Sequence, residues 1–336
     1  MADAFDLAPK VELHLHLEGA IPRPALWSLI ERYGDETVRA PEDLDALLQY
    51  RDFAHFIETW QWLLPLVRST DDFTFIARAV AESLAQQRIV YAEASISPTD
   101  FRQHGIPVGE VAIAVRRGLD QVEGTHVALL VDLVRDTGPE WCLRTLESII
   151  DVADEAGVVG ITIGGMEAPN PPERYVDVYR RAESAGLGRS VHAGEAAGPD
   201  YVWSALRTLG VDRIGHGVRS VEDAVLVDHL VEQAVPLEVC PTSNLRTGVV
   251  ASWESHPVVE LIERGARVTI NSDDPLFFDC SVAGDLRRVS ELTELDVERH
   301  TGYAIDATFM PDERKAHYRA LVGKWWATRR GSTADA

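Results

Sequence analysis

The chain begins with a short segment, KVELHLHLEGA at 10–20, in which apolar and polar residues alternate strictly. Such alternation is typical of a half-buried β-strand, because successive strand side chains point to opposite sides of a sheet. The apolar face consists of Val11, Leu13, Leu15 and Leu17. The other face carries two histidines between two glutamates, namely Glu12, His14, His16 and Glu18. This pattern leaves open whether the polar face is solvated or lines a site.

Seven further apolar segments, rich in β-branched residues, follow along the chain and predict strands. They span 89–98, 126–135, 158–165, 190–195, 213–217, 236–244 and 267–275. Stretches with apolar residues at helical spacing lie between them, at 108–122, 139–156, 172–185, 199–209, 221–233 and 256–264. Eight strands that alternate with helices predict an α/β fold, a (β/α)8 TIM barrel. An open doubly wound sheet is the alternative, which the absence of GxGxxG after the first strand disfavours.

The long segment between the first two strands, 22–88, is helical in pattern and rich in aromatic residues. It exceeds what one crossover needs, so we predict extra helices after strand 1, part of which could form a lid. No linker-like or low-complexity tract divides the chain, and we therefore expect 1–336 to form a single barrel domain with 22–88 as a helical insertion. The tail at 327–336 reads as disordered.

Charge and composition narrow the choice of partner. The 336 residues include 54 acidic and 32 basic ones, a formal net charge of −22, which disfavours a nucleic acid or an anionic membrane as partner. Three cysteines without CxxC spacing suggest neither a disulfide framework nor a thiolate zinc site. No apolar run is long enough to span a bilayer, and no signal peptide is evident. We expect a cytoplasmic protein that acts on a small molecule; its oligomeric state is not predicted.

Histidines and carboxylates gather where the predicted strands end. His14 and His16 end the first strand, His192 and Glu195 end the fifth, His216 ends the sixth, and Asp273 and Asp274 end the eighth. In a barrel these ends share one mouth, and imidazole with carboxylate suits zinc. Other interpretations remain open: Glu195 as a partner of helix N-terminal N–H groups, Asp274 as a turn residue and His216 as a core histidine. We interpret Glu12, one layer deeper, as a member of a buried ion pair.

Five ordered segments then give the chain a clear resemblance. ELHLHLEGA, HAGEAAGP, RIGHGVR, CPTSN and NSDDP together resemble the adenosine and adenine deaminases of the amidohydrolase superfamily, from residue 10 to about 280. The resemblance implies one zinc ion per chain, held by four metal ligands: His14, His16, His192 and Asp273. It also implies a zinc-dependent aminohydrolase that acts on an adenine compound. Lys10, Lys315 and Lys324 are the only lysines and none lies near the end of strand four, which favours a single metal over a lysine-bridged pair.

The resemblance further implies roles for individual residues. Glu195 would donate a proton to purine N1, and His216 would orient and deprotonate the attacking water. Asp274 would hydrogen-bond to N7, and the backbone N–H of Gly165 would approach N3. The chemistry is reasonable, because a metal ion makes water nucleophilic at neutral pH and a buried carboxyl keeps a proton to give to the ring.

Two departures from the family pattern bear on the substrate. Adenosine deaminases usually have Asp at the position of Glu18, where it contacts the ribose 5′-hydroxyl, and they read GDE where this chain has Gly-Met-Glu at 165–167. The resemblance therefore favours 6-aminodeoxyfutalosine of the menaquinone pathway as substrate, bound in part by Glu18. Adenosine and then adenine are the alternatives. A hydrolase of a non-purine amide and a non-catalytic binding barrel also remain open.

Overall fold

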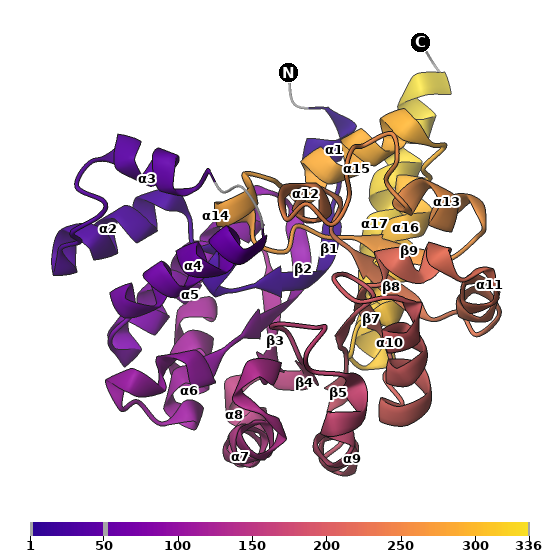
Figure 1. Ribbon diagram of the computed structural model, residues 1–336. Coiled ribbons are helices and arrows are strands. Elements are labelled where there is room, and N and C mark those ends of the chain that lie inside the picture. Colours follow the sequence, from indigo (N-terminus) through magenta and orange to yellow (C-terminus); the bar gives the residue numbers. More distant parts are fainter. Residues whose placement is uncertain (1–2, 50–52, 335–336) are drawn as a thin grey trace.

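The computed structural model describes residues 3–49 and 53–334, and its strands surround a central axis (Figure 1). All strand pairs are parallel. The first sheet contains β1 (Lys10–His16), β2 (Ile89–Ile96), β3 (His126–Asp132), β4 (Val158–Thr162) and β5 (Gly188–Arg189). The second contains β6 (His192–Ala193), β7 (Ile214–His216), β8 (Pro236–Val239) and β9 (Arg267–Ile270).

Backbone hydrogen bonds join the two sheets at both seams. Between β5 and β6, Ser190 N–H donates to Ile161 O at 2.9 Å and His192 N–H donates to Ile163 O at 3.2 Å, so 188–193 acts as one strand. At the other seam, His16 N–H donates to Asp273 O, and Asp273 N–H donates to His14 O, both at 3.0 Å. Counting β5 and β6 together, eight strands form the barrel, which confirms the predicted fold class.

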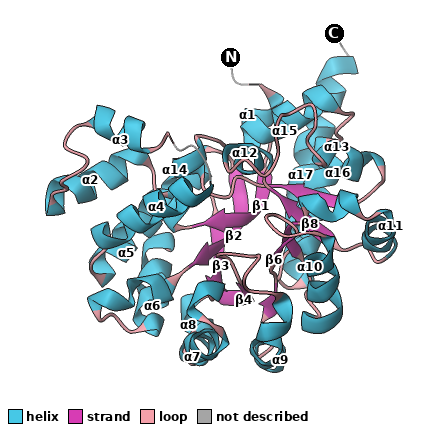
Figure 2. Ribbon diagram, in the orientation of Figure 1, coloured by secondary structure: helices cyan, strands magenta, loops and turns pink. Residues whose placement is uncertain are grey.

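Helices surround the strands (Figure 2). They are α6 (Val108–Leu119), α7 (Pro139–Ile150), α8 (Ala153–Ala156), α9 (Val176–Ser184), α10 (Pro199–Ser204), α11 (Ala224–Glu232), α13 (Val258–Glu263), α15 (Val282–Leu292), α16 (Val297–Ala307) and α17 (Asp312–Ala334). Their starts follow local chemistry: Pro139 occupies the first turn of α7, and the Asp223 side chain accepts from Val225 and Leu226 N–H at the start of α11. Each predicted helical stretch contains such a helix.

The segment between β1 and β2 is helical, as its pattern predicts. It contains α2 (Arg23–Tyr33), α3 (Pro41–Leu47), α4 (Phe53–Leu63) and α5 (Thr70–Gln86); residues 50–52 lie outside the described part. Phe56 of α4 packs against Phe277 and Phe278 of α14 (Pro275–Phe278), with ring centroids 5.6 and 5.1 Å apart. Trp60 lies one turn further along, 6.1 Å from the His16 ring. Helix α4 therefore covers part of the barrel mouth, while lid motion and the single-domain prediction stay predictions.

Two sequence-based expectations are wrong. Glu12 makes no ion pair among the described residues; its carboxylate accepts hydrogen bonds from the backbone N–H and hydroxyl of Ser272, and burial raises its pKa to about 7. The part of the tail at 327–334 continues helix α17 and is not disordered. Trp326, on the same helix, packs against the core, and this contact supports the helix near its end in a way that local composition does not reveal.

Candidate metal centre and active site

The four side chains predicted as metal ligands converge at the carboxyl ends of the strands. His14 and His16 lie on β1, His192 begins β6, and Asp273 follows β9. Their ligand atoms all lie within 4.8 Å of one another. Asp273 Oδ1 is 3.3 Å from the Nε2 atoms of both His14 and His16, and Nε2 of His192 is 3.3 Å from that of His16. Three imidazoles and one carboxylate form a donor set that suits zinc.

A neighbouring group holds the outward-facing atom of each of these four side chains. His14 Nδ1 is 2.9 Å from Glu238 Oε2, His16 Nδ1 is 2.9 Å from Ser95 Oγ, His192 Nδ1 is 3.4 Å from Thr162 Oγ1, and Ser243 Oγ donates to Asp273 Oδ2 at 2.6 Å. On the inward side, His14 Nε2 and Asp273 Oδ1 are buried without a hydrogen-bond partner among the described residues. Unpaired buried polar atoms are costly, and outer partners of this kind orient metal ligands. The cluster therefore fits a metal ion.

His216 lies beside this cluster at the end of β7, with a backbone φ of 58°. The Nδ1 atom of His216 is 3.2 Å from Asn244 Nδ2, and the Nε2 atom of His216 is 3.6 Å from Glu195 Oε2. Burial, and then the nearby charge of His14, lower the pKa of His216 to about 3. The imidazole is therefore neutral at neutral pH and able to orient a water molecule or accept its proton.

Cys240 follows β8 and lies beside the metal-binding cluster. Its thiol, His216 and Asp273 form a second group of potential ligand atoms within 4.8 Å of one another. Burial raises the pKa of the thiol well above its usual value, so the sulfur stays protonated in the metal-free chain. Cys240 is fully buried.

Glu195 follows β6, and its carboxyl lines the same cavity. Burial, and then the charges of Asp273 and Glu167, raise its pKa to about 8, so it retains a proton at neutral pH. The surrounding backbone is held by Glu167, whose carboxylate accepts from four consecutive N–H groups at 194–197, at 2.7 to 3.2 Å. The helix that follows, α10, begins at Pro199 and has no side-chain cap, so the interpretation of Glu195 as a partner of helix N-terminal N–H groups is not what the geometry shows. Glu167 had no sequence signal for this role.

Asp274 projects into the cavity beside Asp273. Its Oδ1 is buried without a hydrogen-bond partner among the described residues, and it makes no side-chain cap for α14. Burial and the charge of Asp273 raise its pKa well above the usual range, so this carboxyl can donate a hydrogen bond. Gly19 makes room for it, since a Cβ at that position would come within 1.8 Å of Asp274 Oδ1.

The other two residues predicted to bind substrate differ in position. Gly165 lines the cavity with a φ of 89°, and a Cβ there would meet Asp136 Oδ2 at 2.2 Å. Glu18 is fully buried and is not among the residues that line the cavity. Its Oε1 accepts from the backbone N–H of Ser97 at 3.0 Å. Direct contact between Glu18 and a substrate stays a prediction.

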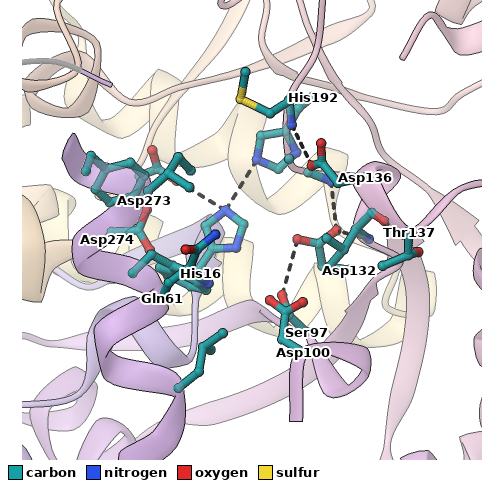
Figure 3. Close-up of a pocket in the computed structure, with 18 of the residues that line it drawn as sticks. His16, Gln61, Ser97, Asp100, Asp132, Asp136, Thr137, His192, Asp273 and Asp274 are labelled. Atoms are coloured by element: carbon teal, nitrogen blue, oxygen red, sulfur yellow. Dashed lines mark hydrogen bonds and ion pairs between the residues drawn. The ribbon is translucent and has the colours of Figure 1, made fainter. Parts of the chain in front are cut away.

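The cavity has a volume of about 700 Å³, which suits a ligand larger than a bare heterocycle. Figure 3 shows His16, Asp273 and Asp274 on one side of it and Asp132, Asp136 and Thr137 on the other. Apolar side chains of α4, among them Phe56 and Trp60, supply a further wall. The arrangement brings a metal-binding cluster, a protonated carboxyl and a neutral imidazole into one cavity with polar and aromatic walls.

Comparison with known proteins gives a consistent result. The family described as Adenosine deaminase matches residues 9–325. The aminodeoxyfutalosine deaminase of Streptomyces avermitilis is 35% identical over 95% of this chain and 91% of its own length.

Two solved structures extend the similarity to the whole fold. The adenine deaminase of Arthrobacter aurescens superposes with a TM-score of 0.89 at 31% identity, covering 95% of this chain and 99% of its own. An amidohydrolase from Burkhoderia ambifaria, solved with bound Zn, has a TM-score of 0.90 at 25% identity, and the match covers 100% of this chain and 96% of the other. Among the described residues, no helix has the length and apolar character needed to cross a bilayer.

Proposed function

The chain belongs to the adenosine deaminase family, and from this premise we propose that it hydrolytically removes the 6-amino group of an adenine nucleoside, using one zinc ion per chain. The observation that carries the proposal is that Glu195 and His216 lie in one cavity with the four side chains that could bind a metal ion. The four ligands would be His14, His16, His192 and Asp273. When bound, the metal supplies a Lewis acid that allows water to act as a nucleophile near neutral pH.

The residues of the chain supply the remaining steps. Neutral His216 orients the water and takes its proton. Protonated Glu195 donates to purine N1 as the bond at C6 forms, because attack on the aromatic ring places charge on that nitrogen. Asp274 forms a hydrogen bond with N7, and Gly165 N–H donates to N3. As the tetrahedral carbon collapses, His216 returns the proton it took from water to the amino group, which leaves as ammonia. The hydroxyl proton passes to Glu195, which leaves a carbonyl at C6, keeps the proton on N1 and restores both residues.

Within this class we propose 6-aminodeoxyfutalosine as the substrate. A cavity of about 700 Å³ leaves room for a large substituent on the sugar, and Glu18 stands where the family usually has the Asp that contacts a 5′-hydroxyl. The similar aminodeoxyfutalosine deaminase supports the same choice. Adenosine is the first alternative and adenine, the substrate named for a similar solved structure, the second.

A substrate screen tests the proposal. Purified metal-loaded enzyme is assayed on adenine, adenosine, 5′-deoxyadenosine and 6-aminodeoxyfutalosine by following purine absorbance. We expect kcat/KM to be highest for 6-aminodeoxyfutalosine and lowest for adenine. A preference of tenfold or more for adenosine would overturn the choice of substrate, and inactivity on every adenine compound would overturn the proposed reaction. The cytoplasmic location stays a prediction.

A further inference from the structure

Two carboxylates hold the loop that follows β4, on the side of the cavity across from Asp273 and Asp274 (Figure 3). Asp132 Oδ1 accepts from the backbone N–H of Gly164 at 2.7 Å and of Val134 at 3.0 Å. Asp136 Oδ2 accepts from Met166 N–H at 2.8 Å. The N–H of Gly165, between these two anchored residues, has no partner among the described residues. Each carboxylate thus uses one oxygen to fix the loop that presents Gly165.

The second oxygen of Asp132 is almost unused. Its one hydrogen bond in the described part of the chain is a long one, 3.3 Å from Ser97 Oγ. Asp132 is only 4% exposed, yet it lines the cavity together with Ser97. An ionised carboxylate oxygen can accept two hydrogen bonds, and leaving that capacity unfilled in a buried position is costly. This oxygen is therefore matched to a ligand that brings a hydrogen-bond donor.

Ser97 is itself fixed in place. Its backbone N–H donates to the fully buried carboxyl of Glu18, while its hydroxyl faces Asp132. The negative charge of Asp132 also acts on Asp100 in the same wall. Burial, and then this charge, raise the pKa of Asp100 to about 6. A wall with this charge favours donors such as sugar hydroxyls.

The chemistry of a purine indicates which part of the substrate reaches this wall. In the proposed reaction N3 faces the N–H of Gly165, and N9 is separated from N3 by a single ring carbon. The N9 substituent therefore starts beside the loop that Asp132 holds. On a nucleoside, the hydroxyls separated from N9 by the fewest bonds are the 2′- and 3′-hydroxyls of the sugar, and one carboxylate can accept from such a pair.

We propose that Asp132, supported by Ser97, binds the 2′- and 3′-hydroxyls of the substrate, which makes the enzyme selective for adenine ribonucleosides over free adenine and dideoxynucleosides. This inference rests on the proposed function and names the residues that recognise the sugar. Glu18 contributes indirectly, by fixing Ser97.

The test pairs one substitution with two substrates. In Asp132→Asn, the amide oxygen can still accept from Gly164 and Val134, while an NH2 group replaces the oxygen that faces Ser97. We expect kcat/KM for adenosine to fall roughly tenfold to a hundredfold, because a hydrogen bond to a charged group is lost. For 2′,3′-dideoxyadenosine, which has no hydroxyl to lose, we expect a change within about threefold. Asp177→Asn, an 89% exposed residue of α9, is the control and should change neither value.

The outcomes separate clearly. An equal fall on both substrates would mean that Asp132 acts only through the loop and would overturn the inference, as would no fall on either. Metal content and circular dichroism check that Asp132→Asn is folded. If it is not, Ser97→Ala carries the test, with a selective loss of roughly threefold to tenfold on adenosine expected, and an unselective loss or none contradicting it. Wild-type inactivity on every adenine compound would overturn the proposed function and this inference together.

Discussion

At the scale of single residues, Glu195 has the environment of a general acid. It is buried, close to other carboxylates and 3.6 Å from His216. Glu195→Gln keeps the shape but has no acidic proton, so we expect kcat to fall roughly a hundredfold to ten-thousandfold with metal content unchanged. Stopped-flow absorbance and elemental analysis measure the two quantities. Glu140→Gln, a 79% exposed residue of α7, is the matched control. Near-normal turnover of Glu195→Gln would remove Glu195 from this role.

The raised pKa of Glu195 also predicts a pH dependence. Only the protonated carboxyl can donate to N1, so activity is present below its pKa and is lost as the pH rises through it. Because burial, Asp273 and Glu167 raise that pKa to about 8, we expect kcat/KM to decline above about pH 8. The residual activity of Glu195→Gln should lack this decline. A profile that is flat up to pH 10 would contradict the assignment.

At the scale of elements, several active-site side chains lie on loops that follow the strands, and contacts between these loops hold the side chains in position. The Glu167 carboxylate accepts hydrogen bonds from four consecutive N–H groups of the 194–197 loop and so fixes the backbone of Glu195. A neutral amide offers one acceptor oxygen where the carboxylate offers two. The loop following β6 therefore depends on a residue that follows β4.

Substitution of Glu167 tests this dependence between two loops. In Glu167→Gln we expect kcat to fall roughly tenfold or more while the metal content remains one ion per chain, because Glu195 is displaced but the ligands are not. Kinetics and elemental analysis are measured on the same preparation. Loss of the metal together with activity would mean that Glu167 supports the whole mouth of the barrel and not the Glu195 loop alone.

At the scale of the whole molecule, the metal site joins segments that are far apart in sequence. His14 and Asp273 belong to β1 and to the loop after β9, the two edges that meet at the seam of the barrel. A ligand that binds only the folded state stabilises it, so metal removal should lower the melting temperature. We expect one zinc per chain, and reversible loss of both metal and activity on chelation.

His14→Ala should reproduce that loss permanently. The variant lacks one of the four converging ligand atoms, which weakens zinc binding and changes the position of any zinc that remains, so we expect roughly a tenth or less of the wild-type metal content and no measurable deamination. Calorimetric melting with and without added zinc provides a second measurement, in which the variant should lose the shift seen for wild type. Two ions per wild-type chain would contradict the single-metal prediction.

The sequence by itself determined the barrel and the identity of the converging residues. Alternation along β1 and the regular succession of strands and helices depend on local periodicity, which a single sequence displays directly. The same periodicity puts His14 and His16 on one face, and parallel strands bring their ends to one mouth. The histidines and carboxylates at the strand ends could therefore be named before any distance was known, while their division into metal ligands and catalytic residues, and the choice of Gly165, came from the resemblance to the deaminases.

Only the tertiary structure decided how those residues are held and what lies around them. Glu238, Glu167 and Ser97 act through contacts between segments distant in sequence, which no periodicity encodes. The same reason explains the errors: Glu12 bonds to Ser272 and not to a cation, and Trp326 supports a tail that composition alone assigns to disorder. Glu18 lies behind Ser97 because β1 ends at His16 and Glu18 begins a short 3-10 helix, so the alternation of the strand no longer sets the direction of its side chain.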